Sequence, residues 1–578
     1  MKQFLKFTLA TVVGLLIFSV ISFFLMLMML GGLMAMSGSS EPAVSPAHSV
    51  YCIEMNGTVR ERTSSDELDA AILEAFGQPA NREYGLNDLL GNIRIAKEDP
   101  NIDGIYLRGG SLAMGSATAE ALRRALLDFR ESGKFIVAYA DSYGQSSYYL
   151  ASCATHLFVN PSGSLDWHGS AATLEFYPRL LEKLGVKMQV VKVGTFKSAV
   201  EPYILTGMSD ANRLQYNVLL NDMWSEKLAS VAASRGISVD SLNLLADRYM
   251  ALQPQEDYVS LGLVDSLCYV QDVERLLEEL TGTDDYSLLT SAVLSPARKE
   301  KYQKDKVAVI YAEGDITDET GDGIVGKDMV ETIAEVAEQD NVKAVVLRVN
   351  SGGGSAYASE QIHHALTLLK ADKPLVVSMG DYAASGGYYI SCPADYIFAE
   401  QTTLTGSIGI FGLIPSFAGT FDKVGIDFDG VKTNRHADLE SNIVFRGMND
   451  DERALFQAEI NRGYELFTGR CAEGRSIPQD SIKAIGEGRV WSGTRALAIG
   501  LVDSIGGLDC AIRKAAELAS LEGYAVVDYP EVEDTFTKLM NALSTSARML
   551  LPSARLEKAI EARLGTDLYR QLRSYEQL

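Results

Sequence analysis

The sequence has few residues of the kinds that bind metals, form disulfide frameworks or contact nucleic acids. Its 578 residues include six cysteines and six histidines, with no CxxC pair, no zinc-ligand spacing and no HExxH. Lysine and arginine number 52 against 76 aspartates and glutamates, and they form no basic run. This pattern indicates no metal and no cofactor. The net charge of −24 argues against nucleic acid, and against electrostatic docking to anionic lipid.

Charged side chains are also missing from one long segment at the start of the chain. Lys2 and Lys6 precede residues 7–40, which carry no charge before Glu41. A bilayer is spanned by about 20 apolar residues, whereas the core of a cleavable signal is about 7–15 residues long. Ala35-Met36-Ser37 resembles a cleavage site, so removal stays open. We expect residues 1–40 to be an uncleaved, single-pass anchor, with the lysines in the cytoplasm and the rest of the chain outside the inner membrane.

A repeat organises the chain beyond the anchor. Residues 381–390 read DYAASGGYYI and residues 141–150 read DSYGQSSYYL, an offset of 381 − 141 = 240 that needs no gap. Leu-Val-Asp-Ser at 263–266 recurs at 501–504 near the end of each copy. We therefore predict five segments: anchor 1–40, first copy 45–282, linker 283–305, second copy 306–530 and helical tail 531–578.

Each copy alternates apolar runs typical of buried strands with segments of helical periodicity. In the second copy, 344–349 and 374–379 read as strands and 327–338 as a helix. The first copy repeats this at 135–140 and 119–129. Continuous apolar strands separated by helices predict an α/β fold with parallel βαβ units, covered on both sheet faces.

The two copies differ where chemistry could occur. Ser385 faces Gln145 in the repeat, and Lys197 faces Ala437. Ser385 follows a strand and precedes Gly386-Gly387 and an apolar helix, so its hydroxyl would be exposed and the next amides could face an oxyanion. The segment is close to GxSxG without matching it. A plain helix cap is the alternative.

A glycine-rich loop and a possible base accompany this serine. Gly352-Gly353-Gly354 lies between a strand and a helix, where it would suit an oxyanion-hole amide, an edge that pairs with a peptide, or a plain turn. None of the histidines has a telling context, and no GK[ST] phosphate loop comes after the glycines. Lys197 lies among apolar neighbours after a strand at 188–193, and a buried lysine can replace histidine in a Ser–Lys dyad. Its loss at Ala437 makes it a candidate, although a surface lysine is the simpler interpretation.

Together these motifs resemble the signal peptide peptidase A family, also called protease IV, in its long, double-domain, membrane-bound form. The most specific matches are GTFKSAVEP at 194–202, RVNS at 348–351, ASGGYYIS at 384–391 and TGSIG at 405–409. The family has Ser-Pro-Gly-Gly where this chain has Ser351-Gly352-Gly353-Gly354, so a fixed φ is lost and the loop gains freedom.

The resemblance implies tandem Clp-protease/crotonase-like domains and a serine endopeptidase acting on signal-peptide remnants and other unfolded apolar peptides on the periplasmic side. It implies Ser385 as nucleophile, Lys197 as general base, Ser407 as the hydroxyl that orients the lysine, and the Gly353 and Gly386 amides as oxyanion hole. It also implies a homotetramer. Two other functions compete: a crotonase-type acyl-CoA enzyme, and a catalytically inactive membrane scaffold.

Overall fold

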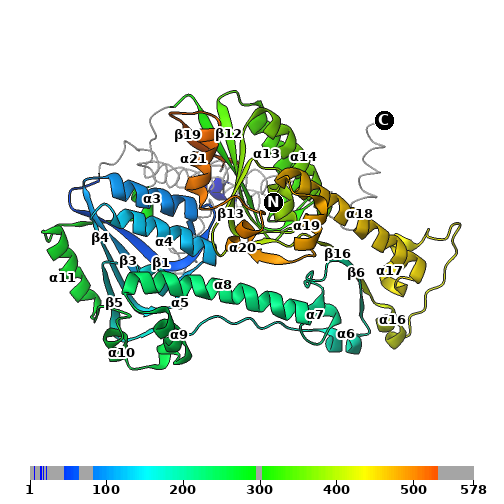
Figure 1. Ribbon diagram of the computed structural model, residues 1–578, viewed down its shortest axis with the longest axis horizontal. Coiled ribbons are helices and arrows are strands. Elements are labelled where there is room, and N and C mark those ends of the chain that lie inside the picture. Colours follow the sequence, from blue (N-terminus) through cyan, green and yellow to red (C-terminus); the bar gives the residue numbers. More distant parts are fainter. Residues whose placement is uncertain are drawn as a thin grey trace.

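The computed structural model describes residues 45–63, 82–294 and 303–531, with a few single positions between 6 and 21. In these ranges the chain forms two α/β halves that succeed one another in sequence (Figure 1). The expected anchor at 1–40 and the expected tail at 531–578 lie outside the described residues, apart from those positions and Glu531. Within the described part, no helix has both the length and the apolar character needed to cross a bilayer.

The first half is built on a parallel sheet of seven described strands, in the order β2-β1-β3-β4-β5-β7; β8 pairs with the beginning of β1, whereas β2 pairs with its end. Helices α3, α4 and α5 cover one face of this sheet, and α11 covers the other. The bounds are β1 Ser49–Arg60, β2 Glu83–Gly85, α3 Leu86–Glu98, β3 Ile102–Ala113, α4 Ser116–Arg130, β4 Phe135–Tyr143, α5 Gln145–Ala151, β5 His156–Leu165, β7 Ser266–Leu267, α11 Val270–Thr281 and β8 Ser287–Leu289.

The second half repeats this plan with eight described strands, in the order β17-β15-β13-β12-β9-β19, with β14 and β18 branching from β13. Helices α13, α14 and α15 cover one face, and α21 covers the other. The bounds are β9 Lys306–Glu313, α13 Gly326–Glu338, β12 Val342–Ser351, α14 Ala356–Asp372, β13 Leu375–Ala384, α15 Gly386–Ser391, β14 Tyr396–Ala399, β15 Leu404–Gly406, β17 Val490–Ser492, β18 Ser504–Ile505, α21 Leu508–Leu518 and β19 Ala525–Tyr529.

Both sheets are buried on their two faces, which explains why their strands read as continuous apolar runs. Four successive residues of β12, Val345 to Arg348, are each 2% exposed or less. The predicted α/β fold with two parallel-sheet domains is confirmed. The repeat extends to side-chain contacts, because the Tyr148 hydroxyl donates to the Leu263 carbonyl at 2.9 Å and the Tyr388 hydroxyl donates to the Leu501 carbonyl at the same distance.

One excursion of the first half reaches across to the second. Strand β6, Lys187–Val193, pairs antiparallel with β16, Ile410–Ser416, along seven residue pairs. The long helix α8, Asp210–Arg235, then runs back beneath the molecule toward the first sheet (Figure 1). On its way the Gln215 side chain accepts from the Val490 amide at 2.8 Å. Segments of the first half therefore lie within the second half.

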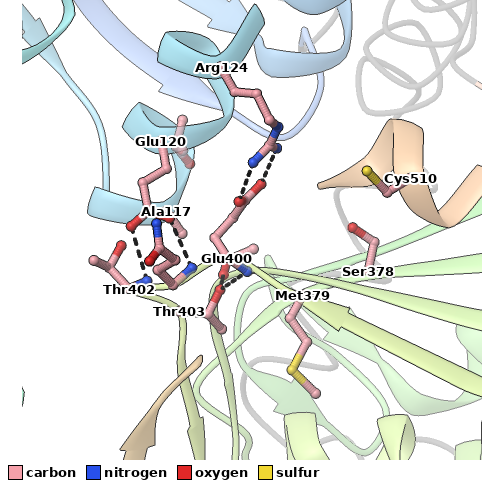
Figure 2. Close-up of polar contacts among 12 residues, drawn as sticks. Ala117, Glu120, Arg124, Ser378, Met379, Glu400, Thr402, Thr403 and Cys510 are labelled. Carbon is pink, nitrogen blue, oxygen red and sulfur yellow. Dashed lines mark hydrogen bonds and ion pairs between the residues drawn. The ribbon is translucent and has the colours of Figure 1, made fainter. Parts of the chain in front are cut away.

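Helix α4 of the first half contacts the second half through an acidic and a basic side chain, Glu120 and Arg124 (Figure 2). Glu120 accepts from the amides of Gln401 and Thr402 at 2.9 and 3.0 Å. One turn further, Arg124 pairs with both carboxylate oxygens of Glu400 at 2.7 and 2.5 Å. Burial, together with nearby carboxylates as a smaller cause, raises the pKa of Glu120 to about 8. Glu120 and Arg124, one turn apart on the same helix, thus contact a single short segment of the other half.

Two more carboxylates cross the same boundary. Asp381 of the second half accepts from the amides of Ala117 and Thr118 at the start of α4, at 2.9 and 3.1 Å, although α4 has no capping side chain of its own. A helix N-terminus favours a carboxylate at this position. Glu61 of the first half pairs with Arg348 of the second at 2.7 Å, and both are at most 3% exposed. The halves are therefore joined by polar contacts that are buried at Glu61–Arg348 and half-buried at Asp381.

Candidate active site

Ser385 occupies a strained turn between β13 and α15. Its φ of 54° and ψ of −117° lie where side chains other than glycine are rare, and its hydroxyl makes no capping bond to α15. The helix-cap alternative is therefore not what the structure shows. Backbone strain of this kind costs about 1–3 kcal/mol and is concentrated at functional sites. The turn is held in place because the Ser385 amide donates to the Gly406 carbonyl at 2.9 Å.

Lys197 belongs to the first half and lies on the loop that follows β6. Its Nζ lies 3.0 Å from Ser385 Oγ, although the two residues are 188 positions apart in sequence. The side chain is 5% exposed. Burial lowers the pKa of Lys197 from 10.5 to about 8, and no carboxylate in the described part of the chain opposes this change. Near physiological pH a minor fraction of the amine is therefore neutral, far more than for a free lysine, and this fraction can accept a proton.

Ser407 lies on the other side of the lysine. Its Oγ is 3.0 Å from Lys197 Nζ and its carbonyl oxygen is 3.1 Å away. Ser407 has a φ of 50°, and its amide donates to the Arg489 carbonyl at 2.7 Å. The ring of Phe411 faces the same Nζ, with its centroid 5.9 Å away. Lys197 is thus held between two serines, with an aromatic ring beside it.

The glycine loop packs directly against the Ser385 turn. Gly353 has a φ of 100°, and a Cβ at this position would come within 2.5 Å of the Gly386 nitrogen and 2.9 Å of Ser385 Cβ. The two amides expected to form an oxyanion hole differ in their present bonding. The Gly353 amide donates to Ser351 Oγ at 3.1 Å. The Gly386 amide has no hydrogen-bond partner among the described residues. The Gly386 amide can therefore donate to an oxyanion without first giving up another hydrogen bond.

The corresponding position of the first half is built differently. Gln145 stands where Ser385 stands in the repeat, and its side chain bonds to the backbone of His168 and Gly169. No positive φ occurs at Gln145. His363, buried in α14, contacts the ring of Tyr389 with 5.5 Å between centroids. In the described part of the chain, no histidine hydrogen-bonds to Ser385, so Lys197 is the basic side chain that reaches this hydroxyl.

Sequence reasoning missed three residues around this site. Ser351 was read only as part of a motif, although its hydroxyl holds a loop amide. Phe411 and Arg489 were not singled out, because an aromatic residue in a strand and an arginine near a turn are common. For Arg489 the sequence offers only Trp491 two positions later, because its other aromatic neighbour, Phe196, is brought beside it by the fold.

Comparison with known proteins gives a consistent result over nearly the whole chain. Peptidase family S49 matches residues 128–284 and 367–522, one stretch in each half. Protease 4 of Salmonella typhi is 36% identical over 558 residues, which cover 92% of this chain and 88% of that protein. Protease 4 of Haemophilus influenzae is 34% identical, covering 84% of this chain and 81% of that one. The chloroplastic serine protease SPPA of Arabidopsis thaliana is 30% identical, covering 89% and 79%.

A solved structure, that of a ClpP1 mutant from Listeria monocytogenes, aligns over 35% of this chain and 94% of that one. Its sequence identity is 16% and its TM-score is 0.25. The assignment of two parallel sheets therefore rests on this chain's own strand pairing.

Proposed function

This chain belongs to peptidase family S49 and is a serine peptidase, and from this premise we propose that it cleaves unfolded apolar peptides through a dyad of Ser385 and Lys197. The observation that carries the proposal is the 3.0 Å distance between Ser385 Oγ and a buried lysine amine whose pKa is lowered to about 8. Membership in a peptidase family argues against the acyl-CoA alternative and against an inactive scaffold.

In the proposed mechanism, neutral Lys197 Nζ takes the proton of the Ser385 hydroxyl as Oγ attacks the peptide carbonyl. The resulting oxyanion would be held by the Gly386 amide and by that of Gly353, once Gly353 gives up its bond to Ser351. Lys197 then returns the proton to the leaving amine, and an acyl-enzyme remains on Ser385. Water, deprotonated by the same lysine, releases the second product. Ser407 orients the amine during both steps.

Aromatic side chains on the elements that lead to the dyad support an apolar substrate. Tyr382 near the end of β13, Tyr357 at the start of α14 and Phe411 on β16 are 51%, 69% and 38% exposed. Exposed aromatic rings on segments next to Ser385, Lys197 and the glycine loop would favour contact with an apolar ligand. We include signal-peptide remnants among the proposed substrates, because the charge-free segment 7–40, with Lys2 and Lys6 before it, would hold the site outside the inner membrane. Recovery of the full chain in the soluble fraction after lysis would refute this location.

We further propose a homotetramer, in line with the family resemblance. Light scattering of the purified full chain in detergent measures its mass directly, and a monomer mass would refute this.

The dyad is tested by hydrolysis of an apolar peptide ester, combined with mass spectrometry of the enzyme. Ser385→Ala and Lys197→Ala should each abolish turnover and acylation, and the double variant should be scarcely worse, because the two groups act as one unit. Gln145→Ala, at the position matching Ser385 in the first half, is the control and should remain active. Near-normal turnover in either single variant, with the fold intact by circular dichroism, would refute the assignment.

A further inference from the structure

Among the described residues, the Arg489 guanidinium has two aromatic neighbours and no acidic one. Its Cζ lies 4.1 Å from the ring centroid of Trp491 and 4.8 Å from that of Phe196. In the described ranges, its side chain makes no hydrogen bond and no ion pair. Other half-buried arginines of this acidic chain do have partners: Arg475 pairs with Asp503 and Arg470 pairs with Glu360. The absence of a carboxylate beside Arg489 is therefore unusual for this molecule.

The aromatic neighbours satisfy only part of what a guanidinium can bind. Cation–π contacts use its flat faces, whereas its five N–H donors point outward in the plane of the group. These donors match the two oxygens of a carboxylate, which they can bind side by side. Burial and then the nearby Arg495 lower the pKa of Arg489, and no acidic group raises it. An anion placed against the edge of this group would therefore meet uncompensated positive charge.

The backbone of Arg489 is tied to the dyad. Its carbonyl accepts from the Ser407 amide at 2.7 Å, and Ser407 Oγ lies 3.0 Å from Lys197 Nζ. Gly488 packs so closely on Lys197 that a Cβ there would lie 2.6 Å from the lysine's own Cβ. Phe196, which stacks on the guanidinium, is the residue next to Lys197. The guanidinium and the dyad are thus carried by adjoining backbone, Phe196-Lys197 on one side and Gly488-Arg489 on the other.

We propose that Arg489, whose guanidinium lies over the rings of Phe196 and Trp491, binds the C-terminal carboxylate of the peptide substrate. This rests on the proposed peptidase function and adds a substrate class to it. An apolar peptide carries few anionic side chains, and its C-terminus is the anion that every such peptide has. The scissile bond then lies a few residues before that end. The enzyme would prefer fragments released by an earlier hydrolysis, whose new C-termini are free, over segments that are still continuous with a protein.

The test uses one apolar peptide in two forms, ending in a free carboxylate or in a carboxamide, with the full-length enzyme. We expect kcat/KM to be about ten- to a hundredfold higher for the acid, the range of a charge-assisted hydrogen-bonded contact. In Arg489→Met, whose side chain can still pack against both rings, kcat/KM for the acid and for the amide should become equal. Arg489→Lys should keep part of the preference. Arg435→Met, which removes an exposed arginine of the second half, is the control and should keep the full ratio.

Three outcomes separate this inference from the peptidase proposal. Equal kcat/KM for acid and amide in the unmodified enzyme would overturn the carboxylate site while leaving the dyad standing. An unchanged ratio in folded Arg489→Met would overturn it as well. Failure of the unmodified enzyme to cleave either peptide, or cleavage that persists in Ser385→Ala, would instead refute the dyad. If Arg489→Met does not fold, the acid-to-amide ratio of the unmodified enzyme and of Arg489→Lys decides.

Discussion

Replacing Lys197 by methionine should make the protein inactive but more stable at neutral pH. Burial lowers the pKa of this lysine from 10.5 to about 8. At about 1.4 kcal/mol per pH unit, charging the lysine in the folded state is penalised by about 3 kcal/mol. Methionine has a similar length and carries no charge, so it removes this penalty while filling the same space.

The gain is reduced by the bonds that methionine cannot make. Lys197 contacts the hydroxyls of Ser385 and Ser407 at 3.0 Å, and each such bond contributes about 1 kcal/mol. At pH 7 the net gain should therefore be about 1–2 kcal/mol. For a domain of this size, roughly 2–4 °C of melting temperature corresponds to each kcal/mol.

The difference between the two proteins should depend on pH with a definite sign. Between pH 8 and 10.5 the unfolded lysine still holds its proton and the folded one has lost it, so the stability of the unmodified protein rises with pH. Below pH 8 both states are protonated and the full penalty is present. Above pH 10.5 neither state is charged and the penalty is gone. Lys197→Met should therefore be more stable at pH 7 and less stable at pH 10.5.

Thermal unfolding of the full chain in detergent, recorded at several pH values between 7 and 10.5, measures this crossover. Lys183→Met, at an exposed position on α6 (Pro178–Leu184), is the matched control, because an exposed lysine has no burial penalty to remove. A constant difference in melting temperature between Lys197→Met and the unmodified protein at all pH values would refute the argument.

Two further predictions concern the rate of hydrolysis and the joint between the halves. The logarithm of kcat/KM should rise with pH through one ionisation near 8 and then level off, because only the neutral amine of Lys197 can take a proton; a flat profile from pH 6 to 9 would contradict this. Glu61→Leu should lower the free energy of unfolding by about 3–5 kcal/mol, because Arg348 is left buried and unpaired, and Arg348→Met in the same chain should restore much of the loss. Urea unfolding measures both variants, and a single variant as stable as the unmodified protein would show that the pair does not join the halves.

The sequence predicted the sheets well because their strands are buried on both faces. A run such as 344–349 has no polar side to interrupt it, and it became the middle of β12. Ser385 and Lys197 could be chosen because the repeat contains Gln145 and Ala437 in their places. The pairing of β6 with β16 brings these two residues together. It could not be predicted, because nothing in the sequence of either strand indicates which strand it pairs with.

The residues that the sequence did not single out owe their roles to the residues that they contact in the fold, and not to an unusual residue type or motif. Asp381 matched Asp141 in the repeat and looked like an ordinary shared residue, yet it bonds to the start of α4 in the other half. Arg489 is distinguished by the lack of an acidic neighbour, which only three-dimensional positions reveal. Such roles depend on contacts between segments that are far apart along the chain, and a single sequence does not show which segments are in contact.

The crossing of β6 into the second half also has a consequence for biosynthesis. A ribosome completes the first half, with Lys197, long before it reaches Ser385, and the backbone that supports the lysine at Gly488 and Arg489 comes later still. For the proposed dyad, no nascent chain shorter than about five-sixths of the full length contains a complete catalytic site. The order of translation would thus keep the growing polypeptide from cutting itself or its neighbours until its own folding is nearly finished.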